Sequence, residues 1–212
     1  MKVTIVGAGN VGATCAQRIV EGDIAEVYLV DVAEGLAAGK ALDLAEAAPL
    51  AGHSRSVTGG TDYEGAVGSD VVVITAGITR KPGMSRDDLL QTNGRIVSEV
   101  TASIKAVAPQ AIIIVVSNPL DVTTHIAREV SGLPRERVMG MAGALDTARF
   151  RAFIAVELGC SPVDVSAMVL GGHGDSMVPL PRHATVGGVP ITELIEPARL
   201  EEIIERTRNG GA

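Results

Sequence analysis

Two groups of residues in this 212-residue chain combine types and spacings that could do chemistry. His173 has a glycine on each side, and glycines let a backbone fold tightly around a side chain. Asp146 and Arg149 lie three residues apart, so on a helix they would share a face. An imidazole can move a proton, a carboxylate can orient it, and a guanidinium can bind a carboxylate. The ordinary alternatives are a polar loop histidine and a helical ion pair.

A third group is a basic segment, where Arg80, Lys81 and Arg86 lie close together in a chain of net charge −7. Pro82 and Gly83 within the segment predict a loop. Arginine is the planar, bidentate binder of carboxylates. The segment therefore indicates anion capture, with a solvated surface loop as the alternative.

The beginning of the chain predicts the element that would position a cofactor. Residues 3–6 form an apolar, β-branched run that is typical of a strand. A glycine turn at 7–12, a helix at 13–21 and a second apolar strand at 27–30 follow, and that strand ends in Asp31. This order of strand, glycine turn, helix, strand and acid, within about 30 residues, is typical of a dinucleotide-binding unit.

Each residue type in this unit has a physical role. Gly7 permits the tight turn, Gly9 lets a pyrophosphate approach the backbone, and Gly12 lets the helix pack closely on the strand. The helix N-terminus offers free N–H groups to phosphates. Asp31 can accept hydrogen bonds from ribose hydroxyls and would repel a 2′-phosphate, which favours NAD over NADP. A ligand-free turn and a site for FAD or S-adenosylmethionine are the alternatives.

Strands and helices continue to alternate after Asp31. We expect strands at residues 56–58, 70–75, 111–116 and 137–140, and helices at 34–47 (stopped by Pro49), 87–107 and from about 121 to 130. Near-continuous apolar strands in such alternation predict a doubly wound parallel (Rossmann) sheet. Ligands bind beyond the carboxyl ends of its strands.

After Leu145 the pattern changes. We expect a helix at 146–158, a strand-like run at 163–170, a hairpin around Gly187-Gly188 with arms 183–186 and 189–192, and a helix at 200–207. We therefore predict a dinucleotide-binding domain at residues 1–143 and an α+β substrate domain at 144–212. The second is small for a complete domain, so we expect its C-terminal remainder to be missing.

Composition limits the function classes. Hydrophobic residues make up 46% and charged residues 20% of the chain, which predicts a folded protein, and with 2% aromatics its core must be aliphatic. The acidic charge argues against nucleic acid or an anionic membrane as a partner. No apolar run is long enough for a membrane span, and because the first strand is predicted to start at residue 3, we expect no signal peptide. Two cysteines, Cys15 and Cys160, fit the cytoplasm, and we expect no metal site.

NAD together with a carboxylate-binding arginine suggests oxidation of a 2-hydroxy acid. That reaction needs a base for the hydroxyl proton, a group that orients the base, a carboxylate clamp and a cation that polarises the carbonyl. In that order, the candidates are His173, Asp146, Arg149 and Arg86.

Five motifs in order carry a resemblance to a known family. They are Gly7-Ala8-Gly9-Asn10-Val11-Gly12, Arg80-Lys81-Pro82-Gly83-Met84-Ser85-Arg86, Ser117-Asn118-Pro119-Leu120-Asp121, Leu145-Asp146-Thr147-Ala148-Arg149 and Gly171-Gly172-His173-Gly174-Asp175. Over all its residues the chain resembles the lactate/malate dehydrogenase family, and within it the malate dehydrogenases that are similar to lactate dehydrogenases.

The resemblance implies NAD-dependent, reversible oxidation of malate to oxaloacetate. It implies that His173 accepts the proton, that Asp146 holds its imidazole, that Arg149 pairs with the C1 carboxylate and that Arg86 polarises the carbonyl. Arg80 would contact the second carboxylate of this dicarboxylate substrate, where lactate dehydrogenases typically have Gln. A lactate-type enzyme and a fragment that only binds nucleotide are the alternatives.

The resemblance also implies the cofactor contacts and the assembly. Asn118 would contact the substrate and lie beside the nicotinamide. The expected cofactor-binding residues are Gly7, Gly9, Asn10, Val11, Gly12, Asp31, Thr75, Ala76, Gly77, Asn93, Ser117 and Asn118. Family members suggest a homodimer or homotetramer.

Overall fold

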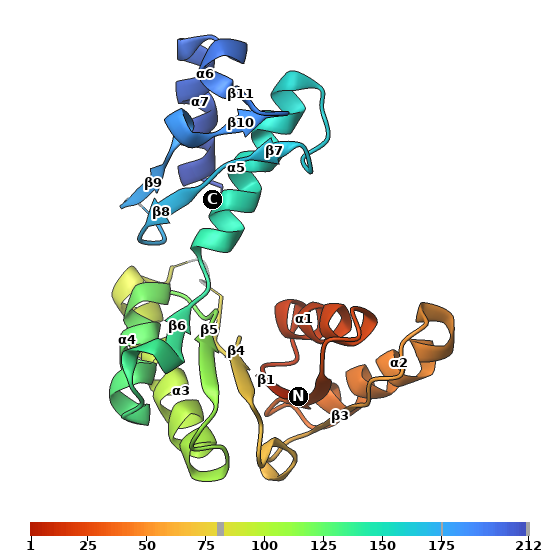
Figure 1. Cartoon of the computed structure of the whole chain (residues 1–212). Coiled ribbons are helices and arrows are strands. Elements are labelled where there is room, and N and C mark those ends of the chain that lie inside the picture. Colours follow the sequence, from red (N-terminus) through yellow and green to blue (C-terminus); the bar gives the residue numbers. More distant parts are fainter. Residues whose placement is uncertain (80–82, 175, 211–212) are drawn as a thin grey trace. The chain divides into compact units, whose positions relative to one another are not determined.

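The computed structural model of the chain describes residues 1–79, 83–174 and 176–210, apart from the side chain of Arg86. It divides into two compact units, Met1–Gly140 and Met141–Ala212 (Figure 1). Each unit has its own cluster of buried apolar side chains.

The first unit is built on a parallel sheet whose strand order is β3-β2-β1-β4-β5-β6. Its strands are β1 (Lys2–Val6), β2 (Glu26–Val30), β3 (Val57–Gly60), β4 (Val71–Ile74), β5 (Ile112–Val115) and β6 (Val138–Gly140). This order defines the dinucleotide-binding form of the doubly wound fold. The predicted fold class is confirmed.

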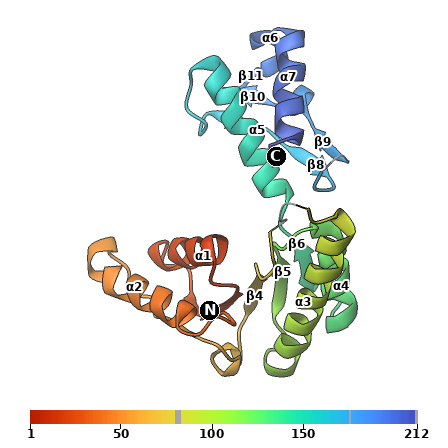
Figure 2. The same ribbon diagram turned by 180° about the vertical axis from the view of Figure 1, so that it is seen from behind.

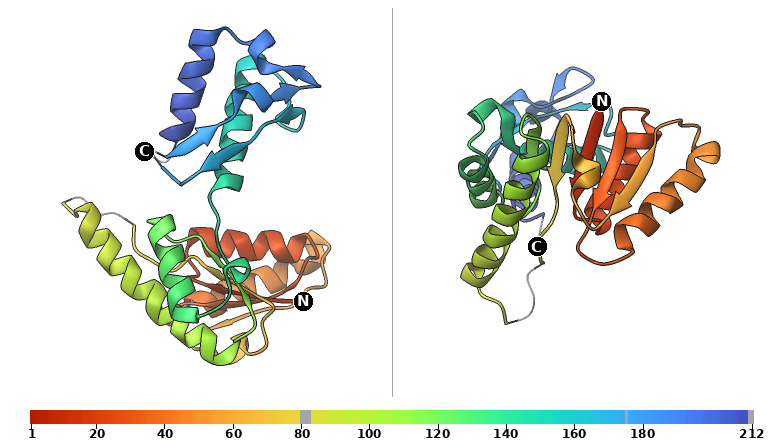
Figure 3. Two further views of the ribbon diagram at one scale, coloured as in Figure 1. Left: turned by 60° about the vertical axis from the view of Figure 1, so that its left-hand side comes forward. Right: turned by 90° about the horizontal axis from the view of Figure 1, so that it is seen from below.

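Helices cover both faces of this sheet. They are α1 (Asn10–Glu21), α2 (Leu36–Ala51), α3 (Arg86–Val107) and α4 (Leu120–Ser131), with short turns of 3-10 helix at η1 (Glu64–Ala66) and η2 (Arg135–Arg137). Helices α1 and α2 lie on one side, and α3 and α4 lie together on the other (Figures 2 and 3). Because both faces are covered, most strand residues must be apolar, and β4 and β5 are apolar throughout, as the sequence predicts.

Aliphatic side chains form the core of the first unit. Ile5 and Leu29 on neighbouring strands are fully buried, and Val20 of α1 and Ala41 of α2 pack in the same cluster. Burial of an Ile or Leu side chain stabilises the fold by roughly 1.5–3 kcal/mol. Cys15 packs against this cluster, and burial raises the pKa of its thiol.

Helix α2 ends later than predicted. Pro49 was expected to stop it near residue 47, but the helix continues to Ala51 and Pro49 lies within its last turn. A proline removes a helical hydrogen bond donor, yet residues after it can remain helical. The helix ends at Gly52, whose φ of 78° is left-handed and whose N–H donates to the carbonyl of Ala48.

Helix α3 starts with a capping box. The Ser85 hydroxyl accepts a hydrogen bond from the Asp88 N–H at 3.0 Å, and the Asp88 carboxylate accepts from the Ser85 hydroxyl and N–H. These bonds from Ser85 lower the pKa of Asp88. The capping box fixes where the helix begins, at Arg86, the last residue of the basic segment.

The second unit packs small antiparallel sheets against two helices. Its elements are α5 (Gly143–Leu158), β7 (Val165–Ser166), β8 (Val169–Gly171), β9 (Met177–Pro179), η3 (Pro181–His183), β10 (Thr185–Val186), β11 (Val189–Pro190), α6 (Ile191–Leu194) and α7 (Pro197–Arg208). Strands β11, β10 and β7 form one sheet, and β8 and β9 form another. Phe150 and Ile154 of α5 are buried with Ile203 and Ile204 of α7.

Two expectations for this unit were wrong in detail. The run at 163–170 is not one strand: β7 pairs with β10 and β8 pairs with β9, so the chain must change partners between them. The hairpin around Gly187-Gly188 is confirmed, but its arms are shorter than predicted. His183 lies in η3, where Pro181 at the first helical position favours a helical start, and Thr192 lies in α6.

Within the described ranges, no helix is long and apolar enough to cross a membrane.

Candidate functional site

The carboxyl ends of the parallel strands gather most of the predicted cofactor residues at one edge of the first unit. Val6 of β1 lies in register with Val30 of β2 and with Ile74 of β4. The segments that follow these strands, the glycine turn and the residues from Asp31 and Thr75, therefore start at the same edge.

The three glycines of the turn are required for three different reasons. Gly7 has a φ of +107°, and a Cβ there would lie 2.6 Å from Thr75 Oγ1. A Cβ at Gly12 would overlap the carbonyl oxygen of Gly7, so this glycine allows α1 to approach the turn. At Gly9 a Cβ would meet nothing within 4 Å, so the space beside its backbone is open to a ligand. The geometry at Gly7 and Gly12 fits the tight turn and the close packing predicted from the sequence, and the role of Gly9 toward a pyrophosphate stays a prediction.

The start of α1 fits a bound pyrophosphate. Gly9 caps the helix without a side-chain hydrogen bond, and no acidic residue lies in the first turn. Asn10 and Val11 are exposed there. The N–H groups of this turn can therefore donate to phosphate oxygens, which the helix dipole also favours.

Asp31 is bound to the glycine turn itself. One carboxylate oxygen accepts a hydrogen bond from the Ala8 N–H at 2.7 Å, and the other accepts from the Ala33 N–H at 2.9 Å. A carboxylate has about four acceptor positions, so each oxygen can still accept from a ribose hydroxyl. The sequence did not predict that these bonds would hold the acid in place.

Three other predicted cofactor residues use their side chains to hold backbone at the same edge. Thr75 Oγ1 donates to the carbonyl of Gly7 at 3.0 Å, and Ser117 Oγ donates to the carbonyl of Ala76 at 2.6 Å. Asn93 is buried. Its side-chain oxygen accepts a hydrogen bond from the Ile78 N–H, and its side-chain nitrogen donates to the backbone carbonyls of Ile78 and Asn118. Thr75 joins the segment after β4 to the glycine turn, and Ser117 and Asn93 join it to the segment after β5.

The segments after β4 and β5 each contain an exposed predicted cofactor residue. Gly77 and Asn118 are both exposed, and the Asn118–Pro119 peptide bond is cis. The role of Asn118 toward substrate and cofactor stays a prediction.

In the second unit the buried carboxylate of Asp146 contacts both His173 and Arg149. Asp146 is 1% exposed. Its Oδ1 accepts a hydrogen bond from Arg149 Nη1 at 3.1 Å, and its Oδ2 lies 2.9 Å from His173 Nδ1. Because a buried charge is costly unless it is paired, these two partners explain how Asp146 is accommodated.

This geometry sets which ring nitrogen of His173 can react. A carboxylate only accepts hydrogen bonds, so Nδ1 carries the proton and donates to Asp146. Nε2 is then the nitrogen that can take a proton from a substrate, and the side chain is 24% exposed. The arrangement can perform acid–base chemistry on a ligand that lies beside Arg149.

The loop that carries His173 depends on a glycine and on a threonine. Gly171 has a φ of +86°, and a Cβ there would overlap the carbonyl oxygen of Ser176. Thr147 Oγ1 accepts a hydrogen bond from the Val169 N–H at 3.0 Å, which ties β8 to α5 next to Asp146. Sequence reasoning missed Thr147, because nothing in the sequence pairs residues 147 and 169.

The structure does not describe the side chains of the three basic residues in the basic segment. Arg80, Lys81 and Pro82 lie outside the described residues, as does Asp175. Arg86 is the first residue of α3, and its side chain is not described. The substrate roles predicted for Arg80 and Arg86 stay predictions.

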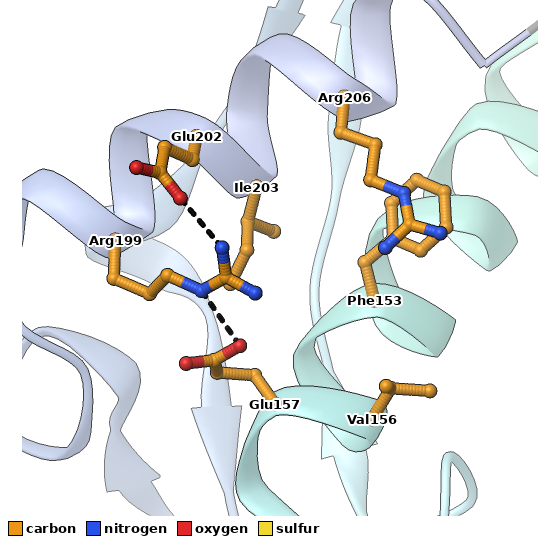
Figure 4. Close-up of a pocket in the computed structure, with 7 residues that line it drawn as sticks. All are labelled: Phe153, Val156, Glu157, Arg199, Glu202, Ile203 and Arg206. Carbon is orange, nitrogen blue, oxygen red and sulfur yellow. Dashed lines mark hydrogen bonds and ion pairs between the residues drawn. The ribbon is translucent and has the colours of Figure 1, made fainter.

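A surface hollow of the second unit lies away from His173, between α5 and α7 (Figure 4). Arg199 bridges Glu157 and Glu202, and Arg206 lies over the ring of Phe153. These contacts occupy the charged groups of the hollow with one another. Within the described part of the chain, no three His, Cys, Asp or Glu side chains are placed to hold a metal ion.

Comparisons with known proteins place both units in one family. Residues 1–140 match the model of the lactate/malate dehydrogenase NAD binding domain, and residues 143–212 match that of the lactate/malate dehydrogenase alpha/beta C-terminal domain. The first match decides for NAD over the FAD and S-adenosylmethionine alternatives.

Individual relatives are similar over the whole chain. A malate dehydrogenase of Cytophaga hutchinsonii is 60% identical over 213 residues, covering 100% of this chain and 68% of the relative. The malate dehydrogenase structure from Salinibacter ruber has a TM-score of 0.94 at 54% identity and covers 100% of this chain and 67% of its own.

The similarity extends to lactate dehydrogenases, and the relatives are longer than this chain. The Cryptosporidium parvum lactate dehydrogenase, solved with lactic acid and β-nicotinamide adenine dinucleotide, has a TM-score of 0.93 at 42% identity, covering 99% of this chain and 68% of its own. The chain spans 64% to 68% of the length of the curated relatives it matches. The chain belongs to the lactate/malate dehydrogenase family, and its first unit is the NAD-binding domain of that family.

Proposed function

We propose that the chain carries the chemistry of an NAD-dependent malate dehydrogenase, which interconverts malate and oxaloacetate. The observation that carries this proposal is the buried Asp146 carboxylate, bonded to His173 on one oxygen and to Arg149 on the other. A base, its orienting group and a carboxylate clamp thus share one small region. Relatives that are 60% identical are named malate dehydrogenase.

The side chains of the second unit handle the proton and the carboxylate. In malate oxidation His173 Nε2 takes the hydroxyl proton, while Asp146 holds Nδ1–H and stabilises the imidazolium that forms. Arg149 has donors left after its bond to Asp146, and they bind the C1 carboxylate of the substrate. NAD, when bound, accepts the hydride from C2.

The basic segment supplies the remaining two roles in this proposal. Arg86 acts on the reacting carbonyl, where negative charge grows in the transition state. Arg80 pairs with the distal carboxylate, which malate and oxaloacetate have and lactate and pyruvate lack. Asn118 contacts the substrate beside the nicotinamide.

Arg80→Gln tests the substrate assignment. Loss of one partner of a buried charge-assisted pair costs roughly 2–5 kcal/mol, or about 30- to 5,000-fold. We expect kcat/KM for oxaloacetate to fall by that range, and kcat/KM for pyruvate to rise. Steady-state kinetics with NADH and each keto acid measure the ratio of kcat/KM for oxaloacetate to kcat/KM for pyruvate.

Arg95→Gln is the matched control, because Arg95 is exposed on α3 and makes a long ion pair with Glu99. If the ratio in Arg80→Gln moved less than about tenfold, a lactate-type enzyme would be the better assignment. If the parent chain bound NADH and reduced neither keto acid, the chain would be a nucleotide-binding fragment.

We also propose that the protein, at the full length of its relatives, associates as a homodimer or homotetramer in the cytoplasm. Helix α2 supports association, because Leu42 and Leu50 on it are 58% and 94% exposed. The two free cysteines support a reducing compartment. Light scattering of the purified protein measures the assembly, and a monomer mass at all concentrations contradicts it.

A further inference from the structure

We propose that Gly210 is a positioning residue for Arg149. The absence of a side chain at position 210 leaves the space that the Arg149 side chain occupies, which keeps its guanidinium against Asp146. Only the consequence for substrate binding rests on the proposed function, in which Arg149 binds the C1 carboxylate.

The contact between the two residues is direct. A Cβ at Gly210 would overlap Cδ and Nε of Arg149 and would lie 2.9 Å from its Cζ. All three of the nearest atoms belong to Arg149. The backbone at 210 therefore packs against the stem and head of this one side chain, which is 18% exposed.

The conformation of Gly210 does not itself require a glycine. Its φ is not among the positive values that twelve other glycines of the described residues adopt. An alanine could take the same backbone conformation without strain, so the added methyl group is the whole perturbation. Position 210 must lack a side chain because the Arg149 side chain occupies the volume that a Cβ would fill.

The pairing of α7 with α5 sets this contact. Arg199 bonds Glu157 at 2.8 Å, and the Arg206 guanidinium lies 4.1 Å from the centre of the Phe153 ring (Figure 4). The positions on α7 rise as those on α5 fall, so the two helices run antiparallel. The same register continues to Gly210 and Arg149, beyond the end of α7.

The end of α7 is held in place by its own bonds. Thr207 is fully buried, and its hydroxyl donates to the carbonyl of Ile203 at 2.8 Å. Asn209 donates from its side chain to Glu205, and the Gly210 N–H donates to the carbonyl of Thr207 at 3.4 Å. A methyl group at 210 would thus meet a fixed backbone on one side and a flexible arginine on the other.

The arginine is the part that would move. The overlapping atoms lie near the far end of a long side chain, which can change rotamer at small cost to the fold. Its displacement would break the bond from Arg149 Nη1 to Asp146 Oδ1 and move the carboxylate-binding donors. The expected signature is a change at Arg149 with little loss of stability.

A spectroscopic experiment tests this without any assay of activity. We would label the full chain with [15N]arginine, assign the Arg149 Nε–Hε resonance by its loss in Arg149→Lys, and compare Gly210→Ala with the parent. We expect that resonance to shift or broaden while the melting temperature changes by less than about 3 °C. An unshifted resonance overturns the proposal.

Two control variants distinguish steric overlap with Arg149 from other effects of the substitution. Gly39→Ala makes the same change in α2, where a Cβ meets nothing within 4 Å, and should leave the Arg149 resonance unchanged. Asn209→Ala loosens the end of α7 without adding an atom at 210. A shift in Asn209→Ala equal to that in Gly210→Ala would assign the effect to the helix end and overturn the proposal.

A double variant keeps the test valid if Gly210→Ala folds poorly. In Arg149→Ala the space beside position 210 is empty, so adding Gly210→Ala should cost no further melting temperature. A further loss as large as that in the parent background would show that Gly210 serves the backbone, which overturns the proposal.

Kinetics give the functional consequence. Arg149 binds a carboxylate that is present in both the ground state and the transition state, so Gly210→Ala should raise the KM for oxaloacetate at least tenfold with kcat changed less than threefold, roughly. The KM for NADH should stay the same. An unchanged KM for oxaloacetate beside a shifted Arg149 resonance would contradict the clamp role of Arg149 in the proposed function and leave the positioning role of Gly210 supported.

Discussion

The two candidate sites of this chain are made in different ways. In the first unit, six consecutive residues form the turn, and their contribution is backbone: a left-handed Gly7, an open face at Gly9 and a close approach at Gly12. In the second unit, the contribution is side chains, and Asp146 and His173 come from positions 27 residues apart. One site is local in sequence and the other is assembled by tertiary contacts.

This difference determines which substitutions each site can tolerate. A backbone site depends on atoms that are absent, so adding a methyl group damages it. A side-chain site depends on atoms that are present and on the contacts that aim them, such as the bond from Val169 to Thr147. Asp31 is intermediate, because its side chain is held by backbone N–H groups of the local turn.

The largest effect should come from removing the acid–base group. His173→Asn keeps a polar side chain but cannot exchange a proton, so we expect oxaloacetate reduction to slow by about 10²- to 10⁴-fold. NADH affinity, measured by fluorescence titration, should not change, because the first unit is untouched. His183→Asn is the matched control, since His183 is exposed in η3. A rate for His173→Asn within about tenfold of the parent would remove His173 from the mechanism.

Gly12→Ala should damage the backbone site by a smaller amount. The added Cβ overlaps a carbonyl oxygen, which cannot move as a side chain can. Overpacking of this kind costs roughly 1–3 kcal/mol, so NADH should bind about 5- to 150-fold more weakly. Gly39→Ala, in open space, should bind NADH as the parent does. Equal affinity in both variants would mean that the turn does not need the space at Gly12.

Asp31→Asn should have the smallest effect. The amide keeps an oxygen for the Ala8 N–H but removes the charge that repels a 2′-phosphate. We expect the preference for NADH over NADPH to narrow by about tenfold or more, a figure set by one like-charge contact. Affinities for both cofactors, measured side by side, give the ratio. A parent protein that binds both cofactors equally would contradict the role given to Asp31.

The local site and the main strands could be predicted from the sequence for physical reasons. Strands of a buried parallel sheet are apolar on both faces, so β1, β4 and β5 are recognisable as runs of Val and Ile. The glycine turn is contiguous, and the helical spacing of Asp146 and Arg149 predicts their ion pair.

Features that depend on tertiary pairing could not be predicted. The division of residues 163–170 into two strands depends on which partner each half finds. The contact of Gly210 with Arg149 needs the register of α7 on α5. No local pattern encodes these pairings.

The most direct test of the central claim follows the hydride itself. We would incubate the chain with oxaloacetate and NADH deuterated at C4 of the nicotinamide, using each stereoisomer in turn, and examine the product by deuterium NMR. We expect that one stereoisomer gives malate with deuterium at C2, and that His173→Asn binds the same NADH and forms far less of this malate. Bound NADH with no C2-deuterated malate from the parent chain would contradict the account.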